Sequence, residues 1–156
     1  IPPSLICLEI TEQATLRNPG LATTAMKKLR KLGVRFSLDD FGTGATSLGY
    51  LRDLPLDYVK IDKSFIRKLH QDKASSLIIQ FIVELGREIG FQTIAEGVEE
   101  LDLLLDLEAL GITIAQGYVV SRPQPLLSDT QPLFFLQAGR DRIAAHRQAA
   151  GAGAAP

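Results

Sequence analysis

Short apolar runs alternate with longer amphipathic stretches along most of the chain. Each run has the length of one strand and is mostly β-branched or otherwise apolar. The runs occupy residues 5–8, 34–38, 58–59 with Ile61, 93–95 and 112–115. Between them, apolar residues recur at the three- and four-residue spacing of an amphipathic helix. The pattern therefore predicts strands that alternate with helices.

Three of the predicted helices end at a glycine that stands just before a strand, where glycine permits a left-handed turn. The apolar stripes and their glycines are Leu21, Ala25, Leu29 and Leu32 before Gly33; Leu77, Ile78, Phe81, Ile82, Leu85 and Ile89 before Gly90; and Leu101, Leu104, Leu105 and Leu110 before Gly111. This alternation indicates βαβ units and a parallel sheet, hence the α/β class.

Two α/β architectures fit this alternation: an open doubly wound sheet and a closed (β/α) barrel. Periodicity does not choose between them. The sequence contains neither Gly-x-Gly-x-x-Gly after its first strand nor a Walker motif, so the open nucleotide-binding folds lack their usual signature.

Composition limits the partners of the chain. Its 156 residues include 17 basic and 18 acidic side chains, and this balance argues against binding a nucleic-acid polymer. No apolar stretch approaches the roughly 20 residues of a membrane span, so we expect no membrane contact by this segment. The single cysteine, Cys7, excludes an intrachain disulfide, and its apolar neighbours predict a buried core thiol rather than a reactive one.

Polar residues follow the apolar runs at five predicted strand ends. They are Glu9, Asp39 with Asp40, Lys60, Glu96 and Gln116. The carboxyl ends of parallel strands share one rim, so these side chains could converge. Carboxylates suit Mg²⁺ or Mn²⁺, and two such ions can assist phosphodiester hydrolysis. The alternative is that the acidic residues cap helices or lie on the surface.

The histidines do not change this picture. His70 is expected in a loop and His146 in a solvated tail, and neither is expected to bind a metal ion. With a single cysteine and no histidine cluster, a zinc site is not expected. The loop that contains Gly42, Thr43 and Gly44 could let backbone N–H groups approach an anion, or could be an ordinary turn with Ser47 as N-cap.

A series of motifs in this order resembles the EAL domain family. The motifs are Leu8-Glu9-Ile10-Thr11-Glu12, Asp39-Asp40-Phe41-Gly42-Thr43-Gly44, Val59-Lys60-Ile61-Asp62, Ala95-Glu96-Gly97-Val98-Glu99 and Gln116-Gly117-Tyr118. The resemblance extends to Pro123. It implies an incomplete TIM-like (β/α) barrel, roughly the last five βα units, and hydrolysis of cyclic di-GMP to linear pGpG with two Mg²⁺ or Mn²⁺ ions.

The resemblance also implies roles for single residues. Glu9, Asp39 and Asp40 match metal ligands, Lys60 matches the residue that positions the attacking water, and Glu96 matches a general base or water-orienting acid. Glu12 matches a glutamate that steadies the Asp-Asp-Phe-Gly loop. Supporting roles fall to Gln116, Thr11, Glu99, Gly42, Thr43, Gly44 and Pro123.

The two lysines near the third strand are expected to differ. Lys60, at the open rim, should matter for catalysis and contribute little to folding. Lys63 matches no motif of the family and is expected to be a solvated residue.

Two departures from the family pattern stand out. Ala45-Thr46 replace a frequent Tyr-Ser, which we expect to change little. The Glu-Ala-Leu motif and a later metal-binding Asn are absent, and both belong to strands that would precede Ile1. We therefore expect that the chain begins inside a larger protein, that it is inactive alone, and that two sheet edges are exposed.

We expect residues 1–139 to belong to the EAL domain and residues 140–156, rich in Ala and Gly, to be a disordered tail.

The leading hypothesis is a cyclic-di-GMP phosphodiesterase. The alternative is a degenerate EAL module that binds cyclic di-GMP or partner proteins without catalysis, and a third reading is an unrelated βα protein. By resemblance, we expect a homodimer of the complete protein, a sensory or GGDEF-type domain upstream, and a cytoplasmic location, which a membrane-anchored parent protein would also allow.

Overall fold

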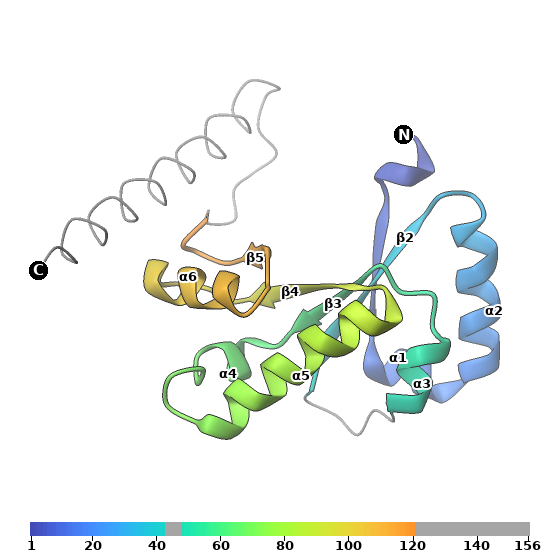
Figure 1. Cartoon of the computed structure of the whole chain (residues 1–156). Coiled ribbons are helices and arrows are strands. Elements are labelled where there is room, and N and C mark those ends of the chain that lie inside the picture. Colours follow the sequence, from blue (N-terminus) through green and yellow to red (C-terminus); the bar gives the residue numbers. More distant parts are fainter. Residues whose placement is uncertain (43–47, 121–156) are drawn as a thin grey trace, which may run out of the picture.

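Figure 1 shows the computed structural model of the chain, in which residues 1–42 and 48–120 are described. Strands and helices alternate as the apolar pattern predicts. In chain order the elements are the 3-10 helix η1 (Pro3–Leu5), β1 (Cys7–Thr11), α1 (Glu12–Arg17), α2 (Pro19–Arg30), β2 (Arg35–Phe41), α3 (Leu48–Asp53), β3 (Tyr58–Ile61), α4 (Lys63–Ile66), α5 (Lys73–Ile89), β4 (Gln92–Glu96), α6 (Leu101–Ala109) and β5 (Ile114–Gln116).

The five strands form one parallel sheet in the order β1-β2-β3-β4-β5. A doubly wound sheet reverses its strand order at a switch point, whereas a (β/α) barrel adds each new strand beside the last one. The sequential order therefore confirms the α/β class and selects the barrel alternative. The described strands form part of such a barrel.

The two faces of the sheet differ in character. One face is apolar and buried, with Phe36, Leu38, Val59, Ile61 and Ala95 in the core. The helices supply the other side of this core through Met26, Ile66, Ile79, Ile82 and Leu107. Successive residues of a strand point to opposite sides, so the residues that alternate with these core positions lie on the opposite face. Polar side chains lie on that face. That polar face positions the candidate site.

The three predicted helices with terminal glycines are confirmed as α2, α5 and α6. Gly33, Gly90 and Gly111 all have positive φ, between 95° and 98°, as a left-handed helix end requires. The short helices α1 and α4 were not predicted, and α3 was indicated only by the alternative interpretation in which Ser47 is an N-cap. With only four to six residues each, they are too short to display a helical period.

The expectation that Cys7 is a buried core thiol is wrong, because its side chain is exposed. Cys7 lies at the start of β1, one of the two edge strands of the described sheet, and four of the five residues of β1 are exposed. An edge strand has a neighbour on one side only, so apolar neighbours in sequence do not ensure burial. The exposed β1 agrees with the expected exposed sheet edge.

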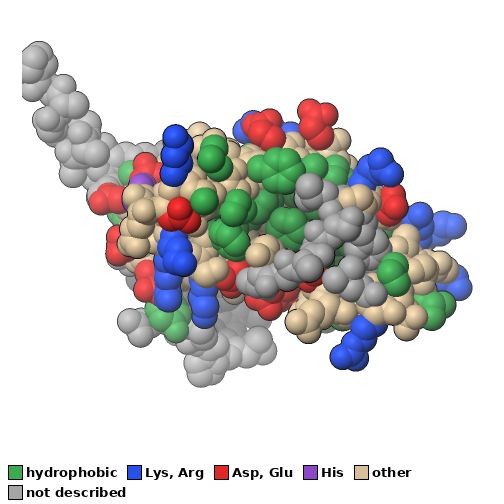
Figure 2. All heavy atoms as spheres, turned by 90° about the horizontal axis from the view of Figure 1, so that it is seen from below, with side chains coloured by type: hydrophobic (Ala, Val, Ile, Leu, Met, Phe, Trp, Pro, Cys, Tyr) green, Lys and Arg blue, Asp and Glu red, His purple; other side chains and the backbone are tan. Residues whose placement is uncertain are grey.

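Apolar side chains also remain exposed on α5. Leu77, Ile78 and Phe81 are 38–55% exposed, although they belong to the apolar stripe of that helix. Figure 2 shows hydrophobic side chains gathered in the middle of one face of the molecule.

Among the described residues, no helix combines the length and apolarity that crossing a membrane would require. His70 lies in a turn, as expected, while His146 and the predicted tail at 140–156 fall outside the described residues.

Candidate active site

Four neighbouring strands bring one lysine and three carboxylates together on the polar face of the sheet. Lys60 of β3 lies at the centre, with its Nζ 2.6 Å from Glu96 Oε1, 3.1 Å from Asp39 Oδ1 and 3.2 Å from Glu9 Oε1. Lys60 is only 4% exposed. Residues that are far apart in the sequence thus form one charged cluster, because their strands are adjacent and parallel.

Asp40 joins this cluster through an irregularity in β2. The pairing of β2 with β3 shifts register between Leu38 and Phe41, and Asp40 has a φ of 56°. In a regular strand Asp39 and Asp40 would point to opposite faces. Instead, ligand oxygens of Asp39, Asp40 and Glu96 lie within 4.8 Å of one another. A positive φ is costly for a residue other than glycine and is typical of functional sites.

The charges of the cluster alter the proton affinity of its members. Burial disfavours the charged form of Lys60, but hydrogen bonds to Glu96 and Asp39 outweigh it and raise the lysine pKa above its ordinary value. Lys60 is therefore a cation at neutral pH. Burial raises the pKa of Glu96, and the opposing hydrogen bond from Lys60 does not cancel this increase. A carboxylate with a raised pKa accepts a proton more readily than an ordinary one.

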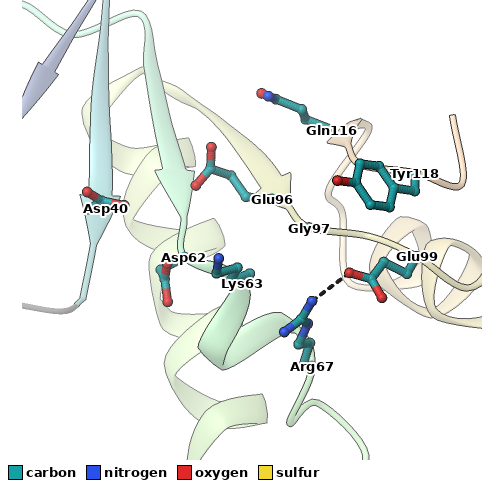
Figure 3. A pocket seen from close by; sticks show the side chains of 10 residues that line it. Asp40, Asp62, Lys63, Arg67, Glu96, Gly97, Glu99, Gln116 and Tyr118 are labelled. Carbon is teal, nitrogen blue, oxygen red and sulfur yellow. Dashed lines mark hydrogen bonds and ion pairs between the residues drawn. The ribbon is translucent and has the colours of Figure 1, made fainter. Parts of the chain in front are cut away.

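A cavity of about 430 Å³ opens beside this cluster (Figure 3). Asp40 and Glu96 lie on one part of its wall, and Gln116, Glu99 and Tyr118 lie on another. The first two belong to the carboxylate cluster, so the cavity reaches the candidate metal ligands. Its volume is within the range of small-molecule sites.

The predicted supporting residues have different environments. Gln116 and Glu99 line the cavity, whereas Thr11 accepts a hydrogen bond from Ala14 N and caps α1. Glu12 is 5% exposed, and its carboxylate oxygens have no hydrogen-bond partner among the described residues. Gly42 has a φ of 98°, and a Cβ there would lie 2.7 Å from the Phe65 ring. Thr43, Gly44, Ser47 and Pro123 lie outside the described residues.

The N-cap interpretation of the strand-end residues is wrong for the residues around Lys60. Glu9, Asp39 and Glu96 lie within strands, and each forms an ion pair with Lys60. Asp62 and Asp72 do act as caps, on α4 and α5 respectively. Burial would raise the pKa of Asp62, but hydrogen bonds from Ser64 outweigh it and lower that pKa.

Three charged residues of the cavity wall were missed as site residues. They are Asp62, Lys63 and Arg67. Lys63 is exposed, as expected, but it also lines the cavity and would collide with a Cβ at Gly97. Lys63 and Arg67 are four residues apart, a spacing that places two side chains on one helix face. That spacing is the one sequence signal that could have indicated their shared position.

Comparisons with known proteins agree with this architecture. A family model described as the EAL domain matches residues 1–123. The cyclic di-GMP phosphodiesterase PdeB of Shewanella oneidensis is 44% identical over 128 residues, which make up 82% of this chain and 15% of PdeB. The chain therefore belongs to the EAL domain family, and it spans a small part of the length of this relative.

Solved structures show the same likeness in three dimensions. The PaMucR phosphodiesterase in complex with c-di-GMP has a TM-score of 0.76 and 39% identity, and the match covers 80% of this chain and 51% of that one. BlrP1 of Klebsiella pneumoniae, in a complex with manganese and cy-diGMP, has a TM-score of 0.74 and 30% identity, with 79% and 31% covered. These matches support the incomplete barrel.

Proposed function

We propose that this chain supplies the C-terminal half of an EAL domain that hydrolyses cyclic di-GMP to linear pGpG with two Mg²⁺ or Mn²⁺ ions. The observation that carries the proposal is the cluster of Asp39, Asp40 and Glu96 oxygens within 4.8 Å of one another at the edge of a cavity. The relatives named cyclic di-GMP phosphodiesterases and the solved cyclic di-GMP complexes support the substrate.

The donor set fits divalent cations that prefer oxygen. Asp39 and Asp40 would hold the ions together with Glu9, whose carboxylate shares Lys60 with Asp39. Without cations, so many carboxylates in one place would repel one another, and Lys60 supplies only a single positive charge. When bound, the ions would neutralise the phosphodiester and make a water molecule more acidic.

The protein groups divide the remaining work. Lys60, held as a cation by Glu96 and Asp39, would orient the attacking water and the oxygen atoms around it. Glu96, whose pKa is raised, would accept the water proton on its carboxylate. The water oxygen forms a bond to phosphorus, the bond from phosphorus to the 3′ oxygen breaks, and the 3′ oxygen takes up a proton from solvent. The products are a 5′-phosphate end and a 3′-hydroxyl end, as in pGpG.

The wider setting is also part of the proposal. The chain covers about half of the PaMucR structure, and we propose that further metal ligands come from preceding strands of a complete EAL domain. A homodimer, a sensory or GGDEF-type domain upstream and a cytoplasmic location are proposed on the family likeness alone.

The direct test is the reaction itself, measured on a complete EAL domain that contains this chain. With Mg²⁺ or Mn²⁺ we expect pGpG to accumulate from cyclic di-GMP, and we expect a chelator to stop it reversibly. Asp53, an exposed residue of α3, provides a control, because Asp53→Asn should leave turnover unchanged. Binding of cyclic di-GMP without any pGpG would favour the degenerate module instead.

A further inference from the structure

An ion pair crosses the wall of the cavity between two elements of the fold. Arg67 Nη2 lies 2.5 Å from Glu99 Oε1, as the dashed line in Figure 3 marks. Arg67 is the C-cap that follows α4, and Glu99 lies in the loop after β4, three residues beyond Glu96. Both residues also line a neighbouring cavity of about 280 Å³. The pair therefore stands between the two cavities.

The backbone on both sides of this pair is fixed. Val98, next to Glu99, is fully buried, donates its N–H to Gln116 O at 3.2 Å and accepts from Val119 N at 3.1 Å. On the other side, Asp62 caps α4 by accepting a hydrogen bond from Ser64 N. With both anchors held, the ion pair restricts the rotamers of Glu99.

Stability alone does not explain this pair. The Arg67 and Glu99 side chains are 55% and 48% exposed, and ion pairs at that exposure contribute little to folding. Their effect on geometry is larger, because a carboxylate held by an arginine at one oxygen presents its remaining acceptor sites in a defined direction. Figure 3 shows this carboxylate on the same side of the cavity as Tyr118.

We propose that Arg67 is a positioning residue, which holds Glu99 so that its carboxylate accepts N–H groups from a guanine base of the ligand. Guanine offers adjacent N1–H and N2–H donors, whereas adenine lacks the N1–H donor. Tyr118, 53% exposed in the same wall, provides an aromatic face on which a base can stack. The inference rests on the proposed function and adds a determinant of base specificity to it.

The first test compares substrates in a complete EAL domain that contains this chain. Arg67→Gln should raise KM for cyclic di-GMP about tenfold, change kcat less than about twofold, and lower the preference over cyclic di-AMP about tenfold. Arg67→Lys should recover part of both losses. Arg87 provides a matched control, since it pairs with Glu84 on α5 at 57% and 64% exposure. Arg87→Gln should change neither KM nor preference.

A charge swap separates positioning from a structural role. Arg67→Glu combined with Glu99→Arg re-forms an ion pair but removes the acceptor, so the thermal midpoint should match that of the unmodified domain while KM and preference should not recover. Recovery of both kinetic values, or a normal KM in Arg67→Gln, would overturn the inference while leaving the proposed function intact. The inference would also be contradicted if Arg67→Gln did not fold and Arg67→Lys, although folded, lost all preference for cyclic di-GMP over cyclic di-AMP. Failure of the unmodified domain to hydrolyse cyclic di-GMP would remove both proposals.

Discussion

Gly117 occupies a position where the loops after β4 and β5 touch, and Gly117→Ala should disturb both. A Cβ at residue 117 would lie 2.2 Å from Val98 O and 2.5 Å from Val98 N. Both atoms belong to the backbone, so no side chain can rotate away to make room. The substitution must therefore push apart the end of β5, which carries Gln116, and the loop after β4, which carries Glu99.

The cost follows from what this movement breaks. Val98 N–H donates to Gln116 O at 3.2 Å, and Val119 N–H donates to Val98 O at 3.1 Å. Each hydrogen bond is worth about 0.5–1.5 kcal/mol, and overpacking a tight site costs about 1–3 kcal/mol. We expect Gly117→Ala to lower the free energy of unfolding by about 3 kcal/mol. Turnover should fall about tenfold or more, because the displaced loops carry cavity residues.

Urea unfolding and steady-state kinetics on a complete EAL domain would measure both effects. Gly90→Ala is the control: Gly90 has a φ of 98°, but no heavy atom lies within 4 Å of the position that a Cβ would take, so only backbone strain of about 1–2 kcal/mol applies. If Gly117→Ala destabilises no more than Gly90→Ala and leaves turnover unchanged, the proposed contact between the loops is wrong.

Two further predictions follow. Lys60→Ala should lower kcat about 10²-fold and also lower the thermal midpoint, because it leaves Glu9, Asp39 and Glu96 without their shared cation. Lys31→Ala, at the exposed end of α2, is the control. If Lys60→Ala changed kcat and the midpoint no more than Lys31→Ala does, the prediction would be contradicted. Asp72→Ala should lower the thermal midpoint at neutral pH. Hydrogen bonds from Ser75 and Ala74 lower the pKa of Asp72 below 3.8, so its stabilisation is complete above that pH and disappears as pH falls through the lower folded value. Equal differences in midpoint at pH 7 and pH 2 would refute it.

The sequence predicted the parts of the fold that depend on local pattern. Each apolar run became a strand, and the glycines after α2, α5 and α6 adopt the left-handed backbone that their position suggested. Apolar periodicity alone could not predict the strand order, since it is the same in open sheets and in barrels; the resemblance to the EAL family predicted the barrel, and the order of the strands confirms it. Burial at the sheet edge was misjudged at Cys7 for a related reason: it depends on which strands and helices are neighbours.

The candidate site was predicted in outline and missed in its details. Polar strand ends indicated a shared rim because parallel strands end on the same side. The register shift that turns Asp40 toward Asp39 leaves no signal in the alternation of residues. The expectation that Lys60 contributes little to folding needs correction, because Lys60 is enclosed by its three partners. Arg67 was missed because its partner, Glu99, lies 32 residues away.

The measurement that tests the central claim most directly is a calorimetric titration with Mn²⁺ of a complete EAL domain that contains this chain. The unmodified domain is compared with its Asp39→Asn variant. Asp39 lies within the carboxylate cluster, so the unmodified domain should bind two ions and the variant should bind Mn²⁺ more weakly. Asp53→Asn should bind like the unmodified domain. Unchanged Mn²⁺ affinity and stoichiometry in Asp39→Asn would contradict the two-metal site.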